Sequence, residues 1–187
     1  MSLVHWGPIP CLLERLLEPG PHERAHAPLR YEPGEIAMIV HAEVPISASR
    51  ASVWAAITDI ENAATLVSGI EKIEIVQRPP TGLVGLRWRE TRILFDKPAT
   101  VEKRIIEAVD GQSYKTTAED SGFVFETTKR IADAGGGGIT LSEAHESRPQ
   151  TLAARLQMIP MGLFFKGVIR KAILQDLNDY KAAVERR

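Results

Sequence analysis

Six consecutive segments between residues 70 and 149 carry the features of β-strands, and this run constrains the fold more than any other feature of the sequence. Turns rich in Gly, Pro and Asp separate the segments, and Asp110-Gly111 is a strong hairpin signal. Strands joined by short turns pair antiparallel, so we expect a meander with one apolar face that another layer must cover. The predicted strands cover residues 70–77, 83–95, 99–109, 112–119, 123–132 and 139–146.

A long helix at the C-terminal end can supply this cover. Residues 161–185 repeat apolar side chains at three- and four-residue steps, which places them on one helix face. A shorter helix is expected over 151–158, and Pro160 should break the path between the two helices because it disrupts helix interiors. A sheet covered by this helix gives an α+β fold. The apolar stripe consists of Phe165, Ile169, Ile173, Leu177, Tyr180 and Val184.

One more strand and two short helices precede the six strands. The apolar stretch over 36–44 predicts a strand, which Pro45 is expected to end. Two short helices should follow, over 50–58 and 60–67, before Ser68-Gly69 stops the second. Side chains suited to cap them are Ser47, Ser49 and Asp59.

The first 34 residues differ in composition from the rest of the chain. They contain six of the twelve prolines and one short amphipathic segment, which is too short to be stable as an isolated helix. We expect residues 1–34 to be a Pro-rich, partly mobile extension, or the product of a gene model that begins too early. Residues 35–187 should then form one folded domain. The apolar side chains of the short segment are Leu12, Leu13, Leu16 and Leu17.

Charge and composition exclude several classes of protein. The 187 residues include 23 Lys and Arg against 24 Asp and Glu, so the sequence lacks the basic excess typical of nucleic-acid binding. The single Cys11 excludes an internal disulfide framework. No apolar stretch approaches the roughly 20 residues of a membrane-spanning helix. We expect a cytoplasmic protein without an integral membrane segment, and the sequence assigns no oligomeric state.

Three sequence segments, residues 44–59, 139–143 and 176–181, together resemble the START/Bet v 1-like helix-grip superfamily. This superfamily is also called SRPBCC and includes the polyketide cyclase/dehydrase and lipid-transport group. The likeness covers about residues 36–187. It implies a curved antiparallel sheet of about seven strands wrapped around a long C-terminal helix, with an apolar ligand cavity between them. Function does not follow, because the superfamily contains binders, carriers, cyclases and other enzymes.

The predicted strand over 83–95 holds the strongest candidate for chemistry. Alternation places four side chains on one face, which should point inward: Leu86, Trp88, Glu90 and Arg92. Glu90 would then lie at or near the cavity, where its carboxyl group could hydrogen-bond a ligand or act as acid or base. The alternative is a structural carboxylate near the rim, paired with a neighbouring arginine.

Aromatic and methionine side chains are the other candidate ligand contacts. The Tyr114 hydroxyl could bind a polar ligand group, and flexible methionines suit an adaptable apolar site. The alternative for these side chains is ordinary core packing. The candidate ligand-binding residues are Leu86, Trp88, Glu90, Tyr114, Phe123, Phe125, Met161, Phe165 and Ile169.

Metal, cofactor and nucleophile motifs are missing from the sequence. Glu143 and His145 share one strand face and His41 lies in another strand, but no HExxH or Cys-rich spacing accompanies them. The glycines at 135–138 lack the Lys-Ser/Thr of a phosphate loop, and no GxSxG elbow occurs. We expect neither a metal nor a cofactor.

Three functions remain open from the sequence. The first is binding or carrying of a hydrophobic small molecule, such as a lipid, isoprenoid or polyketide-like compound. The second is a cyclase or dehydratase that uses Glu90, with Tyr114 or His145, to move protons. The third is a protein-interaction module that uses residues 1–34 or a sheet edge.

Overall fold

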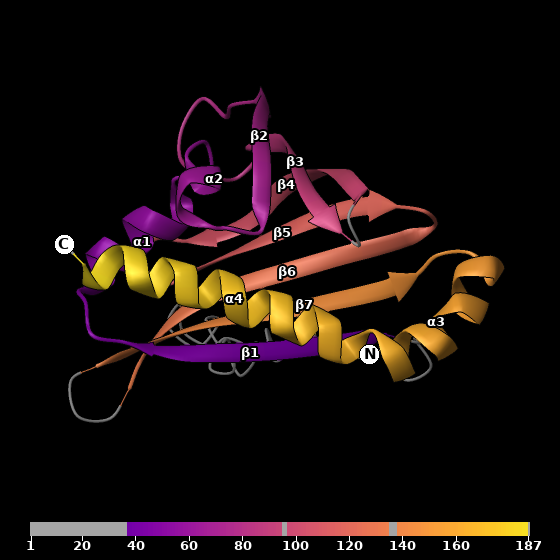
Figure 1. The fold of residues 1–187 in the computed structure, drawn as a ribbon. Helices are drawn as coiled ribbons and strands as arrows, with labels where there is room; N and C mark the ends of the chain where they lie inside the picture. The colour runs from indigo at the N-terminus through magenta and orange to yellow at the C-terminus, as the bar shows by residue number, and fades with distance from the viewer. Residues whose placement is uncertain (1–36, 95–96, 135–137, 187) are drawn as a thin grey trace, which may run out of the picture. The chain divides into compact units, whose positions relative to one another are not determined.

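The computed structural model of the protein describes residues 37–94, 97–134 and 138–186 (Figure 1). The predicted extension over 1–34 lies outside these residues and remains a prediction. No helix in the described ranges is both long and apolar enough to cross a membrane. The elements are β1 (Met38–Ile46), α1 (Arg50–Thr58), α2 (Ala63–Leu66), β2 (Ile70–Gln77), β3 (Arg87–Leu94), β4 (Lys97–Val109), β5 (Ser113–Asp120), β6 (Phe123–Asp133), β7 (Ile139–Pro149), α3 (Leu152–Phe164) and α4 (Lys166–Glu185).

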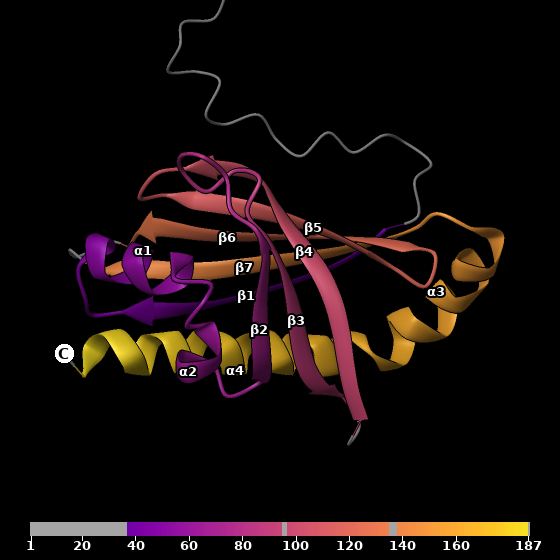
Figure 2. The same cartoon turned by 90° about the horizontal axis from the view of Figure 1, so that it is seen from above.

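The strands of the described part form one seven-stranded sheet in the order β1-β7-β6-β5-β4-β3-β2. Every neighbouring pair is antiparallel. Strands β2 to β7 follow one another in chain order, whereas β1 pairs with β7 and not with β2. The sheet is curved, and α4 lies along its concave face (Figure 2). These features confirm the predicted α+β class, with its meander and covering helix.

The two short helices after β1 have different lengths. Helix α1 has the predicted bounds, and the Ser49 hydroxyl accepts a hydrogen bond from the Ser52 backbone N–H, which caps the helix. Helix α2 is only one turn, so the expected helix over 60–67 was too long. Asp59 does not cap it, because its carboxylate accepts the side-chain amide of Asn62 instead.

Prolines caused several of the incorrect element boundaries, whereas the expected strand over 83–95 begins only at Arg87. Pro45, Pro98 and Pro149 lie inside β1, β4 and β7 rather than at interruptions. At each of these prolines, the strand pairs with another strand on one side only. The backbone N–H that proline lacks is therefore not needed for pairing on the other side. Pro160 lies inside α3, and the helical path instead changes direction at Phe165, between α3 and α4 (Figure 2).

The apolar core lies between the concave face of the sheet and α4. Strand β1 alternates perfectly between buried and exposed residues, as expected for a half-buried strand. Helix α4 turns its predicted stripe toward this face from Ile173 onward. Aliphatic side chains with almost no exposed surface are Val40, Ile46, Val53, Ile57, Val67, Ile105, Leu141 and Leu177.

Candidate functional site

A cavity of about 50 Å³ lies on the concave face of the sheet. Its volume accommodates a few water molecules or a small functional group. Four lining residues are largely apolar: Ile60, Ala63, Ile73 and Trp88. The other eight carry hydroxyl groups or charges: Tyr114, Thr116, Thr127, Glu90, Arg92, Lys103, Lys129 and Glu143. The cavity is therefore much more polar than the apolar one that the sequence led us to expect.

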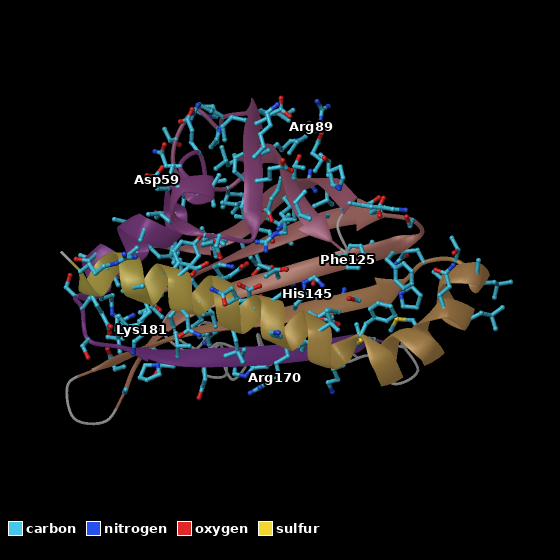
Figure 3. All side chains as sticks on the ribbon, in the orientation of Figure 1. Asp59, Arg89, Phe125, His145, Arg170 and Lys181 are labelled. Atoms are coloured by element: carbon cyan, nitrogen blue, oxygen red, sulfur yellow. The ribbon has the colours of Figure 1, made fainter. Side chains whose placement is uncertain are left out.

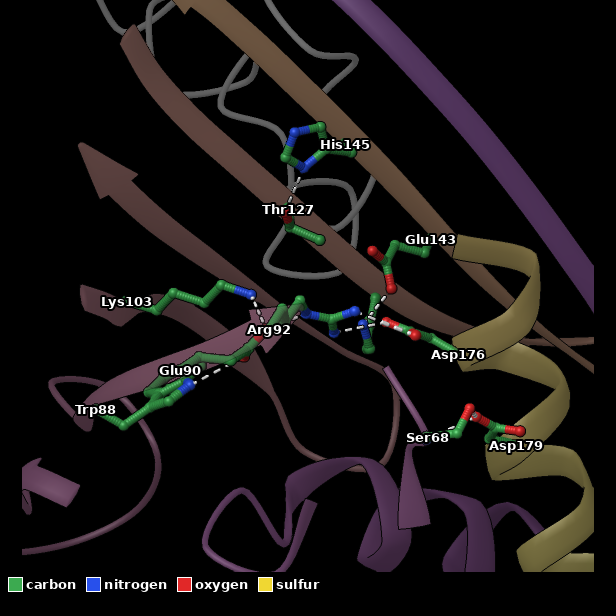
Figure 4. Close-up of polar contacts among 11 residues, drawn as sticks. Ser68, Trp88, Glu90, Arg92, Lys103, Thr127, Glu143, His145, Asp176 and Asp179 are labelled. Carbon is green, nitrogen blue, oxygen red and sulfur yellow. Dashed lines mark hydrogen bonds and ion pairs between the residues drawn. The ribbon is translucent and has the colours of Figure 1, made fainter. Parts of the chain in front are cut away.

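Glu90, on β3, is buried and has three donors around its carboxylate (Figure 4). Lys103 Nζ lies 2.8 Å and Arg92 Nε 2.6 Å from Oε1, and the Trp88 indole N–H donates to Oε2 at 3.3 Å. Burial alone would raise the pKa of Glu90, but Lys103 and Arg92 outweigh it and hold the pKa well below its usual value. Glu90 is thus an ionised, fully bonded carboxylate at neutral pH, which makes it a poor proton donor and a weak base.

Arg92 connects this carboxylate to the covering helix. Its guanidinium contacts Asp176 on α4 through two hydrogen bonds, of 2.7 and 3.2 Å. Gly69 passes closely over the pair, because a Cβ at this residue would lie 3.0 Å from Arg92 Nη1 and 3.1 Å from Asp176 Oδ1. One turn further along α4, Asp179 accepts the backbone N–H and the hydroxyl of Ser68 (Figure 4). Two acidic residues therefore tie α4 to the sheet and to the loop before β2.

A second ion pair lies in a row across three strands. The register places Tyr114 of β5 beside Lys129 of β6, and Lys129 beside Glu143 of β7. Lys129 Nζ donates to the Glu143 carboxylate and lies 6.0 Å from the centre of the Tyr180 ring. Burial would lower the pKa of Lys129 and raise that of Glu143, but their mutual attraction reverses both shifts. The pair therefore stays charged inside the domain.

The two tyrosines beside this ion pair are uncharged. Burial raises the pKa of Tyr114 far above its usual value and that of Tyr180 to about 12. The Tyr114 ring contacts Trp54 edge-on, with 6.4 Å between ring centres. Tyr114 can therefore act at the cavity as a neutral hydroxyl group, as the sequence suggested, but not as a phenolate.

The next row contains a histidine and two threonines. Thr127 pairs with Thr116 on one side and with His145 on the other. The Thr127 hydroxyl and His145 Nδ1 are 2.9 Å apart, and the imidazole stacks on Phe125 at 5.7 Å between ring centres (Figure 3). Burial lowers the pKa of His145, so the neutral imidazole prevails at neutral pH. Thr127 thus links a neutral histidine to the cavity.

The predicted ligand contacts do not all come together. Trp88 and Glu90, on the inward face of β3, and Tyr114, on β5, line the cavity. Leu86 and Phe123 are buried core residues away from its lining, and Phe125 packs on His145. Ile169 is half-buried, Phe165 is exposed at the turn before α4, and the side chain of Met161 lies outside the described part.

Sequence reasoning missed most of the charged residues of the site. The sequence does contain a signal for them, because residues two apart in a strand point to the same face. Lys103 lies two residues from the buried Ile105, and Lys129 lies two residues from the buried Ile131. Asp176 likewise follows Ile173 by three residues, so it borders the apolar stripe of α4. Within the described ranges, no group of three His, Cys, Asp or Glu residues is arranged to hold a metal ion.

The curved sheet, the two short helices after β1 and the long C-terminal helix define a protein of the helix-grip class, the START/Bet v 1-like superfamily. The chain belongs to the family described as polyketide cyclase/dehydrase and lipid transport, whose sequence profile matches residues 38–185. No curated protein matches the sequence.

Three solved structures illustrate the likeness of fold. A START superfamily protein from Mycobacterium smegmatis is 14% identical, with a TM-score of 0.65, and the match covers 79% of this chain and 97% of that one. The ZhuI aromatase/cyclase from Streptomyces sp. R1128 is 16% identical, with a TM-score of 0.65 and coverage of 81% and 96%. Truncated norcoclaurine synthase from Thalictrum flavum is 17% identical, with a TM-score of 0.59 and coverage of 84% and 99%. The family description is compatible with a ligand-binding or cyclase-type role.

Proposed function

We propose that the protein binds or carries a hydrophobic small molecule and holds the oxygen-bearing end of that molecule in the polar cavity. The observation that carries this proposal is the lining of the cavity, where two thirds of the residues offer charged groups or hydroxyls on the concave face of the sheet. The family description, polyketide cyclase/dehydrase and lipid transport, supports a lipid, isoprenoid or polyketide-like ligand.

The charge balance of the site favours a neutral polar group on the ligand. Three cations are paired with three carboxylates, and the network has no net charge. An ionised ligand group would leave one buried member of the network without its partner, which is costly. A hydroxyl or ketone oxygen can accept from these donors without disturbing the pairs. The cations are Arg92, Lys103 and Lys129, and the carboxylates are Glu90, Glu143 and Asp176.

The size of the cavity adds a mechanical requirement. About 50 Å³ holds the polar end of a lipid-sized ligand but not its apolar body. Entry of the body therefore requires α4 to move away from β3. One contact between α4 and β3 that resists this movement is the Arg92–Asp176 ion pair, with its closest atoms 2.7 Å apart.

Native mass spectrometry of the freshly purified full chain tests this proposal. We expect a bound small molecule in stoichiometric amount, which denaturation releases for identification. Titrations with farnesol and with 1,8-dihydroxyanthraquinone, followed by tryptophan fluorescence, give the affinity. Thr127→Val removes a cavity hydroxyl and should weaken binding about tenfold. Thr128→Val, on the opposite face of β6, is the matched control. A protein that carries nothing and binds neither probe would overturn the proposal.

A second candidate is a cyclase- or dehydratase-type enzyme. Its supporting observation is the neutral His145, which is hydrogen-bonded to a cavity hydroxyl. In this candidate His145 accepts a proton from the substrate, directly or through Thr127, while Glu90 stays an ionised structural group. His145→Gln should then abolish turnover of a poly-β-ketone substrate but leave binding within about twofold. Unchanged turnover in that variant would reject the enzyme. The interaction-module hypothesis depends chiefly on residues 1–34, outside the described part, and remains a prediction.

A further inference from the structure

Helix α3 and the first turns of α4 lie at one end of the domain (Figure 2). Several of their apolar side chains are exposed. Leu152 is 78% and Leu156 74% exposed, although α3 packs its opposite face into the core through Ala154 and Met158. In the sequence, apolar residues continue at 159 and 163, in the same three- and four-residue steps. We call the exposed set the α3–α4 patch: Leu152, Leu156, Phe165 and Val168.

The segment that carries the patch is strongly cationic. Residues 147–175 contain no Asp or Glu, whereas the whole chain has 24 acidic residues against 23 basic ones. Figure 3 shows one of the basic side chains, Arg170, at the outer surface. Within the described ranges, the exposed cations of this segment form no ion pair with a carboxylate. They are Arg155, Lys166, Arg170 and Lys171.

We propose that the α3–α4 patch docks the protein onto the surface of an anionic lipid bilayer. Leucine and phenylalanine side chains flanked by Lys and Arg suit the boundary between acyl chains and negatively charged headgroups. A second copy of this chain would present the same positive charge to the patch, so repulsion opposes self-association. The inference goes beyond ligand binding, since it concerns where the protein is held rather than what it holds.

Vesicle co-sedimentation of the full chain tests this inference. We expect binding to phosphatidylcholine vesicles that contain about one third phosphatidylglycerol, and at least tenfold weaker binding to pure phosphatidylcholine. High salt should weaken the binding, because it screens the cations. The double variant Leu152→Glu/Leu156→Glu should bind at least tenfold more weakly than the native chain. Val109→Glu is the matched control, since Val109 is 50% exposed on β4 and lies outside the patch.

Two further measurements keep the result interpretable. Thermal unfolding should be the same for the double variant and the native chain, because both substituted leucines are exposed. Ligand binding measured in solution should also be the same, which separates a failure of docking from a failure of the proposed function. Docking would be refuted if the native chain ignored anionic vesicles or if the double variant bound them equally well. A native dimer that the double variant converts to a monomer would also refute it and identify an interface between copies.

Discussion

Two regions of the same concave face of the sheet have opposite chemistry. Along β1 and the first residues of β7, the side chains turned toward α4 are aliphatic, as at Val44 and Leu141. From Glu143 across to β3, the inner face instead carries the charged network. Aliphatic burial stabilises a fold directly, whereas replacing a buried ion pair by apolar residues is often neutral or stabilising. Stability therefore accounts for the first region but not for the second, which supports a binding role for the charged network.

The largest effect should come from breaking one pair of the charged region. Lys129→Met leaves the Glu143 carboxylate buried without its partner, which should cost about 3–5 kcal/mol of unfolding free energy. Urea denaturation measures this loss. The double variant Lys129→Met/Glu143→Leu should recover most of the stability but not the ligand binding.

A matched control exists on the opposite face of the sheet. Lys115 pairs with Glu126 at 2.6 Å, and Arg148 also contacts Glu126 at 3.0 Å. Lys115→Met therefore leaves Glu126 paired and should cost less than Lys129→Met. If both variants lose the same unfolding free energy, breaking an ion pair at the cavity costs no more than breaking one on the opposite face of the sheet.

Shortening a side chain in the aliphatic region should lower the stability of the fold but leave ligand affinity unchanged. Leu177 is fully buried on α4 and is not part of the cavity lining. Leu177→Ala should cost about 2–5 kcal/mol, through lost burial and the void that remains. Ligand affinity, measured well below the unfolding transition, should stay within about twofold of the native value. A large loss of affinity would show that the two regions are coupled.

Acid should weaken the fold in two stages. The pKa of His145 is lower in the folded state than its usual 6.5, so stability falls as the pH drops through about 6.5 and the unfolded chain takes up a proton. The pKa values of Glu90 and Glu143 are also lowered, so a second loss begins near their usual 4.5 and continues below it.

Urea midpoints measured from pH 8 to pH 3 test this dependence. His145→Gln should remove the upper stage, because glutamine does not titrate. Lys129→Met/Glu143→Leu should reduce the lower stage, because one of its two carboxylates is absent. A native midpoint that stays constant over the whole range would contradict the inferred charge states.

Much of the fold could be predicted because its signals are local. The bounds of α1 and β2 follow from capping and alternation, and the order of β2 to β7 follows from short turns. Several incorrect boundaries fell at prolines such as Pro45 and Pro149, because only the register shows that each has a neighbouring strand on one side. Register depends on long-range pairing, which the local pattern does not contain.

The charged network was harder to predict than the fold. Alternation correctly turned Glu90 inward, and it also places Lys103 and Lys129 on inner faces. Without the register, nothing showed that these side chains would meet, so each looked like an ordinary charge on a solvated strand. The sequence therefore predicted an apolar cavity where the structure has a polar one. The missing information was the alignment of strands and the depth at which α4 brings Asp176 to Arg92.

The smallest expected effect concerns one polar residue at the margin of the two regions. Ser147 is fully buried on β7, where its register partners are Met38 and Phe125. Among the described residues, its hydroxyl is a buried polar group without a hydrogen-bond partner. Ser147→Ala should therefore raise the unfolding free energy by up to about 1 kcal/mol, because a desolvated, unbonded hydroxyl is unfavourable.

Thermal and urea unfolding can resolve this change, with Ser142→Ala as control. Ser142 lies on the same strand, and its hydroxyl is 3.4 Å from the Arg130 carbonyl oxygen, so its loss should not stabilise the domain. If Ser147→Ala is stabilising, the aliphatic region extends along β7 past His145, and the polar cavity is a patch enclosed by apolar packing. If it is clearly destabilising, the Ser147 hydroxyl is bonded in solution, and the polar region reaches the edge formed by β1. The sign of a small change thus locates the boundary between the two regions.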